Sequence, residues 1–384
     1  MLNLAVRNCL GVLGGVFMLM GAGTLLAQVD DRDRSFLTLG GSFNTGDADP
    51  SGSGFLYWNK VDYPWESTNA TIIFAGPFME GQLVRTGVGT PTTAVGFNAG
   101  TLIYLGGLPL QYVDGQPLRD EEVRGNFFFG ELFINHEIGQ YTEYDIPLNL
   151  FLGYALSYSD YFASGDLRPD FVLPSDPLRQ NVEFRVQFGG RKPSLRDQEA
   201  LDVHFRYIYG HNSNWQTFGP LFSPYETNAN YHMLIGSAGA SLPIAEGHYL
   251  GAFVTGMTGW GLDRSSDFVL GGFLQRRRES TRIIGYYTSE FIVDQYALLN
   301  VSYQFPVLDW QKLAGHLYLD YAYFHENTEP NVGWRDALGV GAGVSVELPY
   351  DAALLFAYGY GVNADRVGGS GRHEFVVQTT INFW

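Results

Sequence analysis

The feature that most constrains this chain is an alternation of apolar and polar residues that continues over long stretches. In 373–384, Phe375 and Val377 fall on one face, and Glu374 and Gln378 fall on the other. Successive side chains of a β-strand point to opposite faces, so the stretch is predicted to be a strand with one apolar and one wet face. The same division recurs in two further stretches, 313–324 and 335–348.

The polar face of 335–348 carries mainly small side chains, including Gly339, Gly341 and Gly343. Small residues leave room in an interior or allow another backbone to approach closely. We therefore expect this face to line an interior that another segment can enter.

Sixteen stretches of this kind follow one another, and most are longer than the usual soluble strand of about 5–6 residues. They are predicted at 35–43, 53–60, 68–76, 80–88, 93–105, 125–137, 145–158, 179–190, 199–210, 230–242, 247–260, 294–305, 313–324, 335–348, 351–361 and 373–384. The fourth stretch lies in 77–92, which also fits a long turn.

The connections between these strands alternate between long and short. The long connections are predicted at 106–124, 159–178, 211–229, 261–293, 325–334 and 362–372. A soluble sandwich also alternates along its strands, but long outer loops with short turns at the other end are typical of transmembrane barrels. The sequence therefore predicts an all-β fold, a transmembrane antiparallel up-and-down β-barrel of about 16 strands in a bacterial outer membrane.

Charged residues make up only 16% of the chain, against about 25% in ordinary globular domains. A barrel explains this scarcity, because a charge on the lipid face costs about 2–4 kcal/mol at the midplane. Repeated apolar runs of ~20 residues are absent, which excludes a helical membrane protein. The net charge of −17 argues against nucleic acid as a partner.

Tyrosines near strand ends are expected to form aromatic belts at the two membrane interfaces. Tyr207, Tyr209, Tyr286 and Tyr287 are among them.

Residues 1–27 have the pattern of a secretory signal peptide. Arg7 precedes an apolar run, and the small residue Ala27 suits the position before cleavage. A membrane anchor is the alternative interpretation of the same run. We expect 28–384 to form a single barrel domain without Cys, since the one Cys of the chain is Cys9.

Several motifs in the last third point to a family. Leu270-Gly271-Gly272 opens the longest loop, Arg282-Ile283-Ile284-Gly285-Tyr286 stands within it, and Leu319-Asp320-Tyr321 lies on the second of five following strands. With these motifs, about 120 residues resemble the C-terminal barrel of the BamA/TamA-type bacterial surface antigen superfamily. In that family the loop tip has Arg directly before Gly, whereas two Ile intervene here.

The resemblance implies a barrel that inserts proteins into the outer membrane or secretes them across it, through a seam between the first and last strands. The family's periplasmic POTRA domains have no counterpart in this sequence. We therefore expect a short member that acts on client proteins alone or with a separate periplasmic partner.

The residue types in the longest loop suggest a lumen latch. If 261–293 folds into the lumen, Arg282 would pair with Asp320 in a charge-assisted and bidentate contact, with Gly285 and Tyr286 at the same tip. The alternative is that Arg282 belongs to a solvated loop cluster with 276–278, or that this cluster binds lipopolysaccharide phosphates.

The chain ends on Phe383 and Trp384, which resemble the terminal signal that barrel-assembly machinery recognises. The expected partners are this machinery during biogenesis, outer-membrane lipid and lipopolysaccharide.

None of the 8 His residues shows a metal-like spacing such as His-x-x-x-His. We expect neither an enzyme nor a cofactor. The predicted function is protein insertion or translocation. The alternatives are a passive porin-like channel for small solutes, with an acidic lumen that favours cations, and a plugged structural surface barrel.

Overall fold

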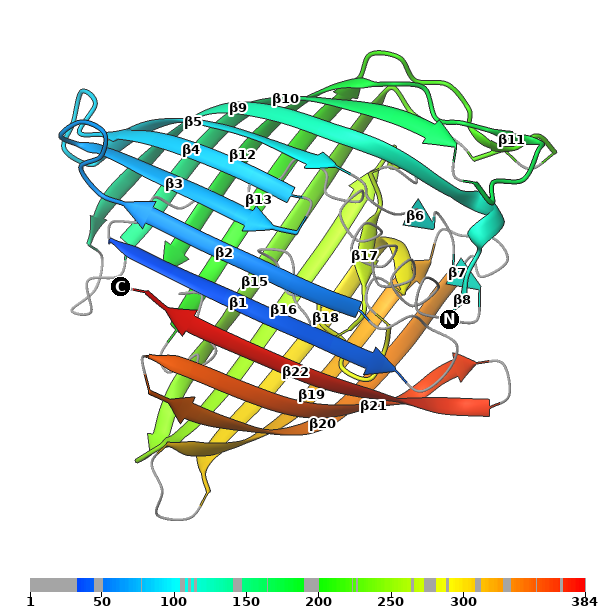
Figure 1. The fold of residues 1–384 in the computed structure, drawn as a ribbon. Helices are drawn as coiled ribbons and strands as arrows, with labels where there is room; N and C mark the ends of the chain where they lie inside the picture. The colour runs from blue at the N-terminus through cyan, green and yellow to red at the C-terminus, as the bar shows by residue number, and fades with distance from the viewer. Residues whose placement is uncertain are drawn as a thin grey trace.

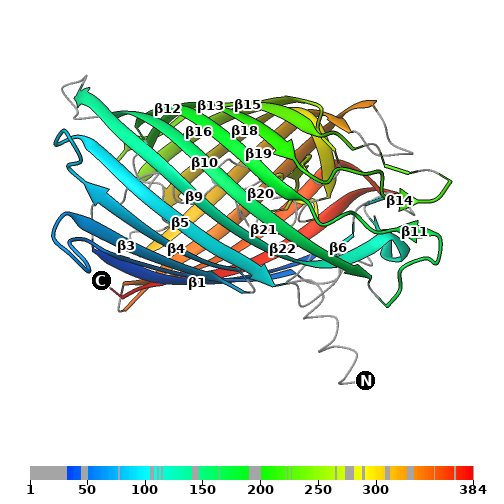
Figure 2. The same ribbon diagram turned by 90° about the horizontal axis from the view of Figure 1, so that it is seen from above.

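The computed structural model of the chain is a closed antiparallel β-barrel of sixteen long strands (Figures 1 and 2). The structure describes residues 33–44, 51–76, 78–103, 108–109, 112–113, 116–140, 147–163, 165–189, 200–222, 224–225, 227–263, 266–272, 281–287, 290–307, 312–326, 333–349, 351–366 and 369–383. The predicted signal peptide, Trp384 and the arginines at 276–278 lie outside these residues.

The barrel strands follow one another in chain order around the wall. They are β1 (Arg34–Asn44), β2 (Ser51–Lys60), β3 (Thr68–Ala75), β4 (Phe78–Thr86), β5 (Thr93–Ile103), β9 (Glu122–Gln140), β10 (Pro147–Ala163), β12 (Leu178–Gly189), β13 (Ala200–Asn212), β15 (Asn230–Ala245), β16 (His248–Trp260), β18 (Phe291–Pro306), β19 (Leu313–Glu326), β20 (Gly333–Leu348), β21 (Ala352–Arg366) and β22 (Gly369–Asn382).

Short elements complete the chain. β6 (Leu108–Pro109) pairs with β9, and β17 (Phe268–Leu270) pairs with β18. β7 (Tyr112–Val113) pairs with β8 (Gln116–Pro117), and a single 3₁₀ turn, η1, covers Arg119–Glu121. Within the described residues, no helix has the length and apolarity needed to span a membrane.

The barrel closes where the first strand meets the last. β1 and β22 pair from Phe36 opposite Asn382 to Asn44 opposite Glu374. The Thr38 and Thr380 hydroxyls lie 2.9 Å apart across this seam. Because the ladder between β1 and β22 is continuous, the barrel wall has no unpaired edge there.

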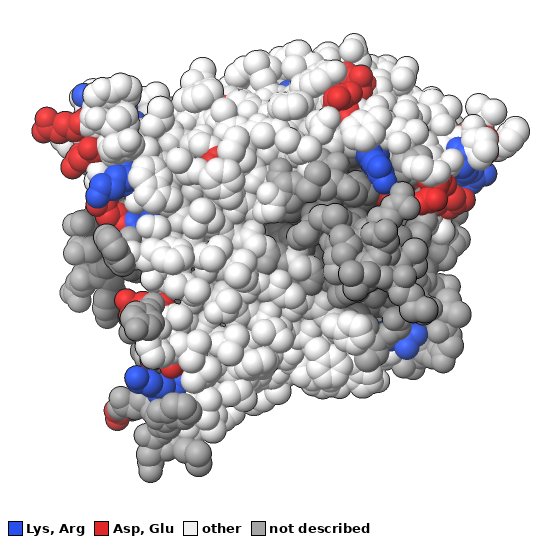
Figure 3. Space-filling model, in the orientation of Figure 1, with Lys and Arg blue, Asp and Glu red and all other residues white. Residues whose placement is uncertain are grey.

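Side chains alternate between an outer apolar face and an inner polar face. On β19, Leu319 and Tyr321 are 40% and 41% exposed, whereas Asp320 between them is 0% exposed. On the face shown in Figure 3, Lys, Arg, Asp and Glu gather toward the two ends and leave a largely uncharged band between them. An uncharged outer band is what a hydrocarbon environment requires of a barrel.

All sixteen predicted strands are present, so the predicted fold is confirmed. The segment 77–92 contains β4 and not a long turn. Two predicted long connections are shorter than expected. β21 ends at Arg366 and β22 begins at Gly369, and β19 ends at Glu326 and β20 begins at Gly333.

The connections that remain long lie at the end of the barrel opposite the start of β1 and the end of β22 (Figures 1 and 2). Two of them are joined there by a small sheet of β11 (Phe171–Val172) and β14 (Gly219–Pro220). The Arg168 guanidinium donates to the carboxylate of Asp170 at 2.7 Å and lowers the pKa of that group.

Candidate functional site: a loop tip on the inner wall

The connection between β16 and β18 brings 281–287 against the buried face of the last five strands. It is attached to the wall by β17, which pairs with β18, and an isolated bridge between Gly272 and Ile283 joins the tip to the residues that follow β17. Ile283 and Ile284 are 0% exposed. The segment is therefore packed against the barrel wall and not extended into solvent.

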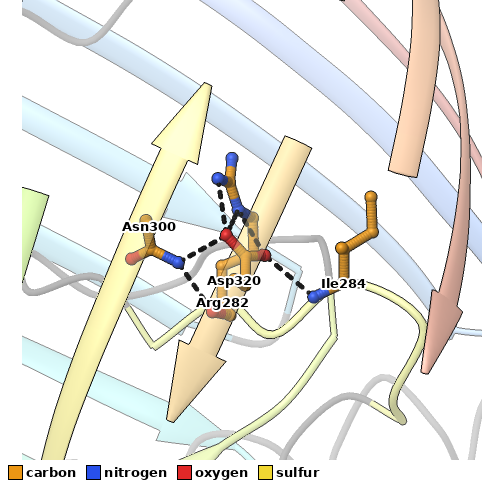
Figure 4. A network of polar contacts seen from close by, with 4 residues as sticks. All are labelled: Arg282, Ile284, Asn300 and Asp320. Atoms are coloured by element: carbon orange, nitrogen blue, oxygen red, sulfur yellow. Dashed lines mark hydrogen bonds and ion pairs between the residues drawn. The ribbon is translucent and has the colours of Figure 1, made fainter. Parts of the chain in front are cut away.

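Arg282 and Asp320 form a bidentate ion pair (Figure 4). The Nε of Arg282 donates to Oδ2 of Asp320 at 3.0 Å, and its Nη2 donates to Oδ1 at 2.9 Å. The Arg282 side chain is 12% exposed and that of Asp320 is 0% exposed. The guanidinium also lies over the ring of Tyr318, 5.0 Å from its centre. Burial of both partners makes this pair stronger than an exposed one, since the water that screens surface pairs is largely absent.

Asp320 also accepts hydrogen bonds from two neighbours of the pair. The backbone N–H of Ile284 donates to Oδ2 at 2.9 Å, and the amide of Asn300 on β18 donates to Oδ1 at 2.7 Å. The same Asn300 amide donates to the backbone carbonyl of Arg282 at 3.0 Å. One carboxylate thus holds both the side chain and the backbone of the loop tip.

A second carboxylate binds the next residue of the tip. The N–H of Gly285 donates to Oε2 of Glu374 on β22 at 2.8 Å, and Glu374 is 0% exposed. Glu374 lies opposite Asn44 of β1, so this contact stands at one end of the seam. Gly285 has φ of +85°, a conformation that residues with a Cβ rarely adopt.

Glycines of β20 and β21 make room for the tip. A Cβ at Gly359 would lie 2.7 Å from the Gly285 nitrogen, and one at Gly361 would lie 2.9 Å from its oxygen. A Cβ at Gly339 would overlap the carbonyl oxygen of Ile284. The close approach that the small inner face of 335–348 predicts is therefore present in the structure.

Tyr286 and Tyr287 are only 1% and 4% exposed, so their predicted place in an aromatic belt was wrong. The Tyr286 hydroxyl donates to Oδ1 of Asn363 on β21 at 2.7 Å. Both tyrosines belong to the loop segment that packs against the inner wall, so neither lies at a membrane interface. Tyr321 and Tyr358 are 41% and 37% exposed on the outer face, as a belt requires.

Sequence reasoning selected Arg282, Gly285, Tyr286 and Asp320, and the structure brings all four to one place. It missed Glu374, although the alternation of 373–384 puts that residue on the inner face. Of the predicted assembly signal, Phe383 is 41% exposed, and its N–H donates to the carbonyl of Ser35 on β1 at 2.7 Å.

The inner wall of β12 and β13 carries a second concentration of charge. Glu183 lies 2.7 Å from Arg206 and 3.6 Å from Arg185, and a separate pair joins Asp202 to His204 at 2.8 Å. All are buried. Within the described ranges, no group of three or more His, Cys, Asp or Glu side chains is arranged to hold a metal ion.

Solved structures share the fold of this chain. CdiB from Escherichia coli matches at a TM-score of 0.62 and 11% identity, over 93% of this chain and 64% of the CdiB chain. BamA from Haemophilus ducreyi lacking POTRA domains 1–3 matches at 0.57 and 9% identity, over 92% and 71%. CdiB from Acinetobacter baumannii matches at 0.56 and 13% identity, over 92% and 61%.

This chain therefore spans less than two thirds of each CdiB chain. No family model and no curated protein matches the sequence. At these identities the likeness establishes the fold, which is that of the outer-membrane β-barrels of CdiB and BamA.

Proposed function

We propose that this chain is an outer-membrane barrel of the protein insertion or translocation type, with the connection 261–290 folded into the lumen as a plug. The observation that carries the proposal is that two buried carboxylates of the barrel wall bind the loop tip. Asp320 holds Arg282 and Ile284, and Glu374 holds Gly285. Both carboxylates lie on strands of the last third, where the sequence motifs also lie.

The role proposed for the Arg282–Asp320 pair is that of a latch. If the loop left the wall, Asp320 would stay on the inner face without its counter-ion, and an unpaired buried charge is costly, so the pair favours the docked loop. The Glu374 contact ties the same tip to β22, the strand that closes the barrel. A client that displaced β22 from β1 would also disturb the plug.

Partners follow from this role. Client proteins, alone or with a separate periplasmic partner, would be the substrates, and barrel-assembly machinery would insert this chain through its terminal strand. Lipid and lipopolysaccharide would surround the uncharged outer band.

Conductance in planar bilayers tests the plug. The purified barrel is expected to give a small current that rises when 276–286 is deleted. A large and steady cation-selective current from the intact chain would contradict the plug and support the porin-like alternative. The buried charges of β12 and β13 favour that second candidate, because a polar wall suits hydrated solutes.

An insertion assay separates a translocation barrel from a structural one. Proteoliposomes that contain this chain are expected to accelerate the membrane insertion of an unfolded barrel protein. A barrel that neither conducts nor accelerates insertion would be a plugged structural protein, a role that the continuous ladder between β1 and β22 also suits.

A further inference from the structure

Outside the loop tip, a second set of oxygen-bearing side chains lies on the opposite part of the inner wall. Glu80 on β4, Asn98 on β5 and Glu131 on β9 are 1%, 0% and 2% exposed. We propose that these three side chains form a binding site for a hard cation, for which Ca²⁺ is the appropriate probe.

The strand register makes the three residues neighbours. Asn98 lies directly opposite Glu131 in the pairing of β5 with β9. On the other side, Asn98 lies opposite Gln82, and Glu80 is the next inward residue of β4 and a diagonal neighbour of Asn98. Directly opposed Cβ atoms are about 4.5–5.5 Å apart and diagonal ones about 7–8 Å, so these side chains converge on one region.

The hydrogen bonding of Glu80 and Asn98 is incomplete. Neither carboxylate oxygen of Glu80 and neither side-chain atom of Asn98 has a hydrogen-bond partner within the described part of the chain. The Asn98 side chain nonetheless lies beside the Glu80 carboxylate. Buried polar groups are nearly always satisfied, so this pair calls for a ligand.

Two aromatic side chains lie beside the set. Phe129 and Phe133 flank Glu131 along β9, and their rings occupy the space over Gly100 and Gly96 on β5. Aromatic walls exclude water, which makes an ionised carboxylate costly unless a cation or donor accompanies it.

Two inner carboxylates elsewhere in the barrel have a cation beside them, and Glu80 differs from these two. Glu183 lies beside Arg206, and Asp320 lies beside Arg282. Within the described ranges, no Lys or Arg forms an ion pair with Glu80. An external cation would supply the missing positive charge.

The donor chemistry selects the class of ion. Two carboxylates and an amide carbonyl offer only oxygen ligands, which suit hard cations, and Ca²⁺ accepts irregular oxygen sets at about 2.3–2.6 Å. The set contains only two acidic side chains, and the amide oxygen supplies the remaining protein ligand. A cation held there would join β4, β5 and β9 and so stabilise this part of the wall independently of any plug.

Calorimetric titration of Ca²⁺ into chelator-treated barrel tests the site. The protein should be refolded from inclusion bodies, since lipopolysaccharide itself binds Ca²⁺. We expect one Ca²⁺ per chain in the unchanged protein, an affinity at least tenfold lower in Glu80→Gln, and an unchanged affinity in Glu246→Gln, which alters an exposed carboxylate of a short turn. Asn98→Asp adds a carboxylate and is expected to tighten binding.

Thermal unfolding supplies the second measurement. Ca²⁺ should raise the unfolding temperature of the unchanged protein and of Asn98→Asp, but not that of Glu80→Gln. Equal Ca²⁺ binding by the unchanged protein and Glu80→Gln would overturn the proposal. The proposal would also be overturned if the unchanged protein bound no Ca²⁺ and Glu80→Gln raised the unfolding temperature equally with and without Ca²⁺. That result would identify Glu80 as a buried carboxylic acid without an ion.

Discussion

Replacing Asp320 with Ala tests the latch most directly. The change removes the counter-ion of Arg282, whose side chain is only 12% exposed, together with the acceptor for Ile284 and Asn300. Removing one partner of a buried ion pair costs about 3–5 kcal/mol. Because part of Arg282 reaches solvent, we take the lower value of about 3 kcal/mol, which weakens docking of the tip on the order of 100-fold.

Hydrogen exchange measures this opening. The informative amide is that of Gly285, because its acceptor is Glu374 on β22, a carboxylate of the wall that remains in the variant. Exchange through local opening follows the opening equilibrium, so this amide should exchange on the order of 100-fold faster in Asp320→Ala. The amide of Ile284 is uninformative because its own acceptor is deleted.

A matched control lies on the same strand. Glu326→Ala removes an ion pair between β19 and Arg335 of β20, at 2.9 Å, and spares the carboxylates that hold the tip. It should leave the exchange of the Gly285 amide unchanged. If Asp320→Ala folds as a barrel and this amide exchanges at the original rate, the pair does not hold the loop and the reasoning is refuted.

Three further changes test other parts of the structure. Gly339→Val places a side chain against the backbone carbonyl of Ile284 in the loop, and such overpacking costs about 1–3 kcal/mol. Proteolysis of the loop should therefore increase, whereas Gly236→Val, which adds a side chain in open space, should leave proteolysis unchanged. A disulfide between Thr38→Cys and Thr380→Cys should form on oxidation, as shown by gel mobility, and should abolish insertion activity reversibly while leaving conductance unchanged; retained insertion would exclude the seam as the route. The pKa of Asp170 is lowered by its guanidinium partner Arg168, so the stabilisation that this contact gives to the sheet of β11 and β14 is present above about pH 4 and is lost as the pH falls through the lowered value. Pepsin cleavage within 164–177 should therefore rise at low pH, and unchanged cleavage would show that the contact does not secure this sheet.

The strands were predictable because each crosses an environment with two different sides. Lipid outside and polar groups inside impose a period of two, and this holds for β19 and for β4, which the sequence left open. The strand ends beyond the apolar band were not predictable. At the end of β21, the polar residues Asn363, Asp365 and Arg366 resemble a loop in the sequence, whereas the structure keeps this end in the ladder with β22 and buries Ala364.

The site was predictable in its residue types and not in its contacts. An inward Asp320 and a loop Arg282 follow from pattern and topology. The partner of Gly285 does not, because a backbone N–H carries no sequence signal for the carboxylate that accepts from it. Glu374 is one of several inward acidic residues, and only the folded loop shows that it is the one that binds the Gly285 N–H.

The position of Glu374 also makes the contact with the loop tip depend on the register of β22 with β1. A shift of one residue along β1 would turn every apolar side chain of β22 inward, so the smallest tolerable slide is two residues. Such a slide moves Glu374 by about 6.6–6.8 Å. A hydrogen bond of 2.8 Å to the Gly285 N–H does not survive that displacement. The tip and the last strand therefore hold each other in a single alignment, and neither can move along the barrel without releasing the other.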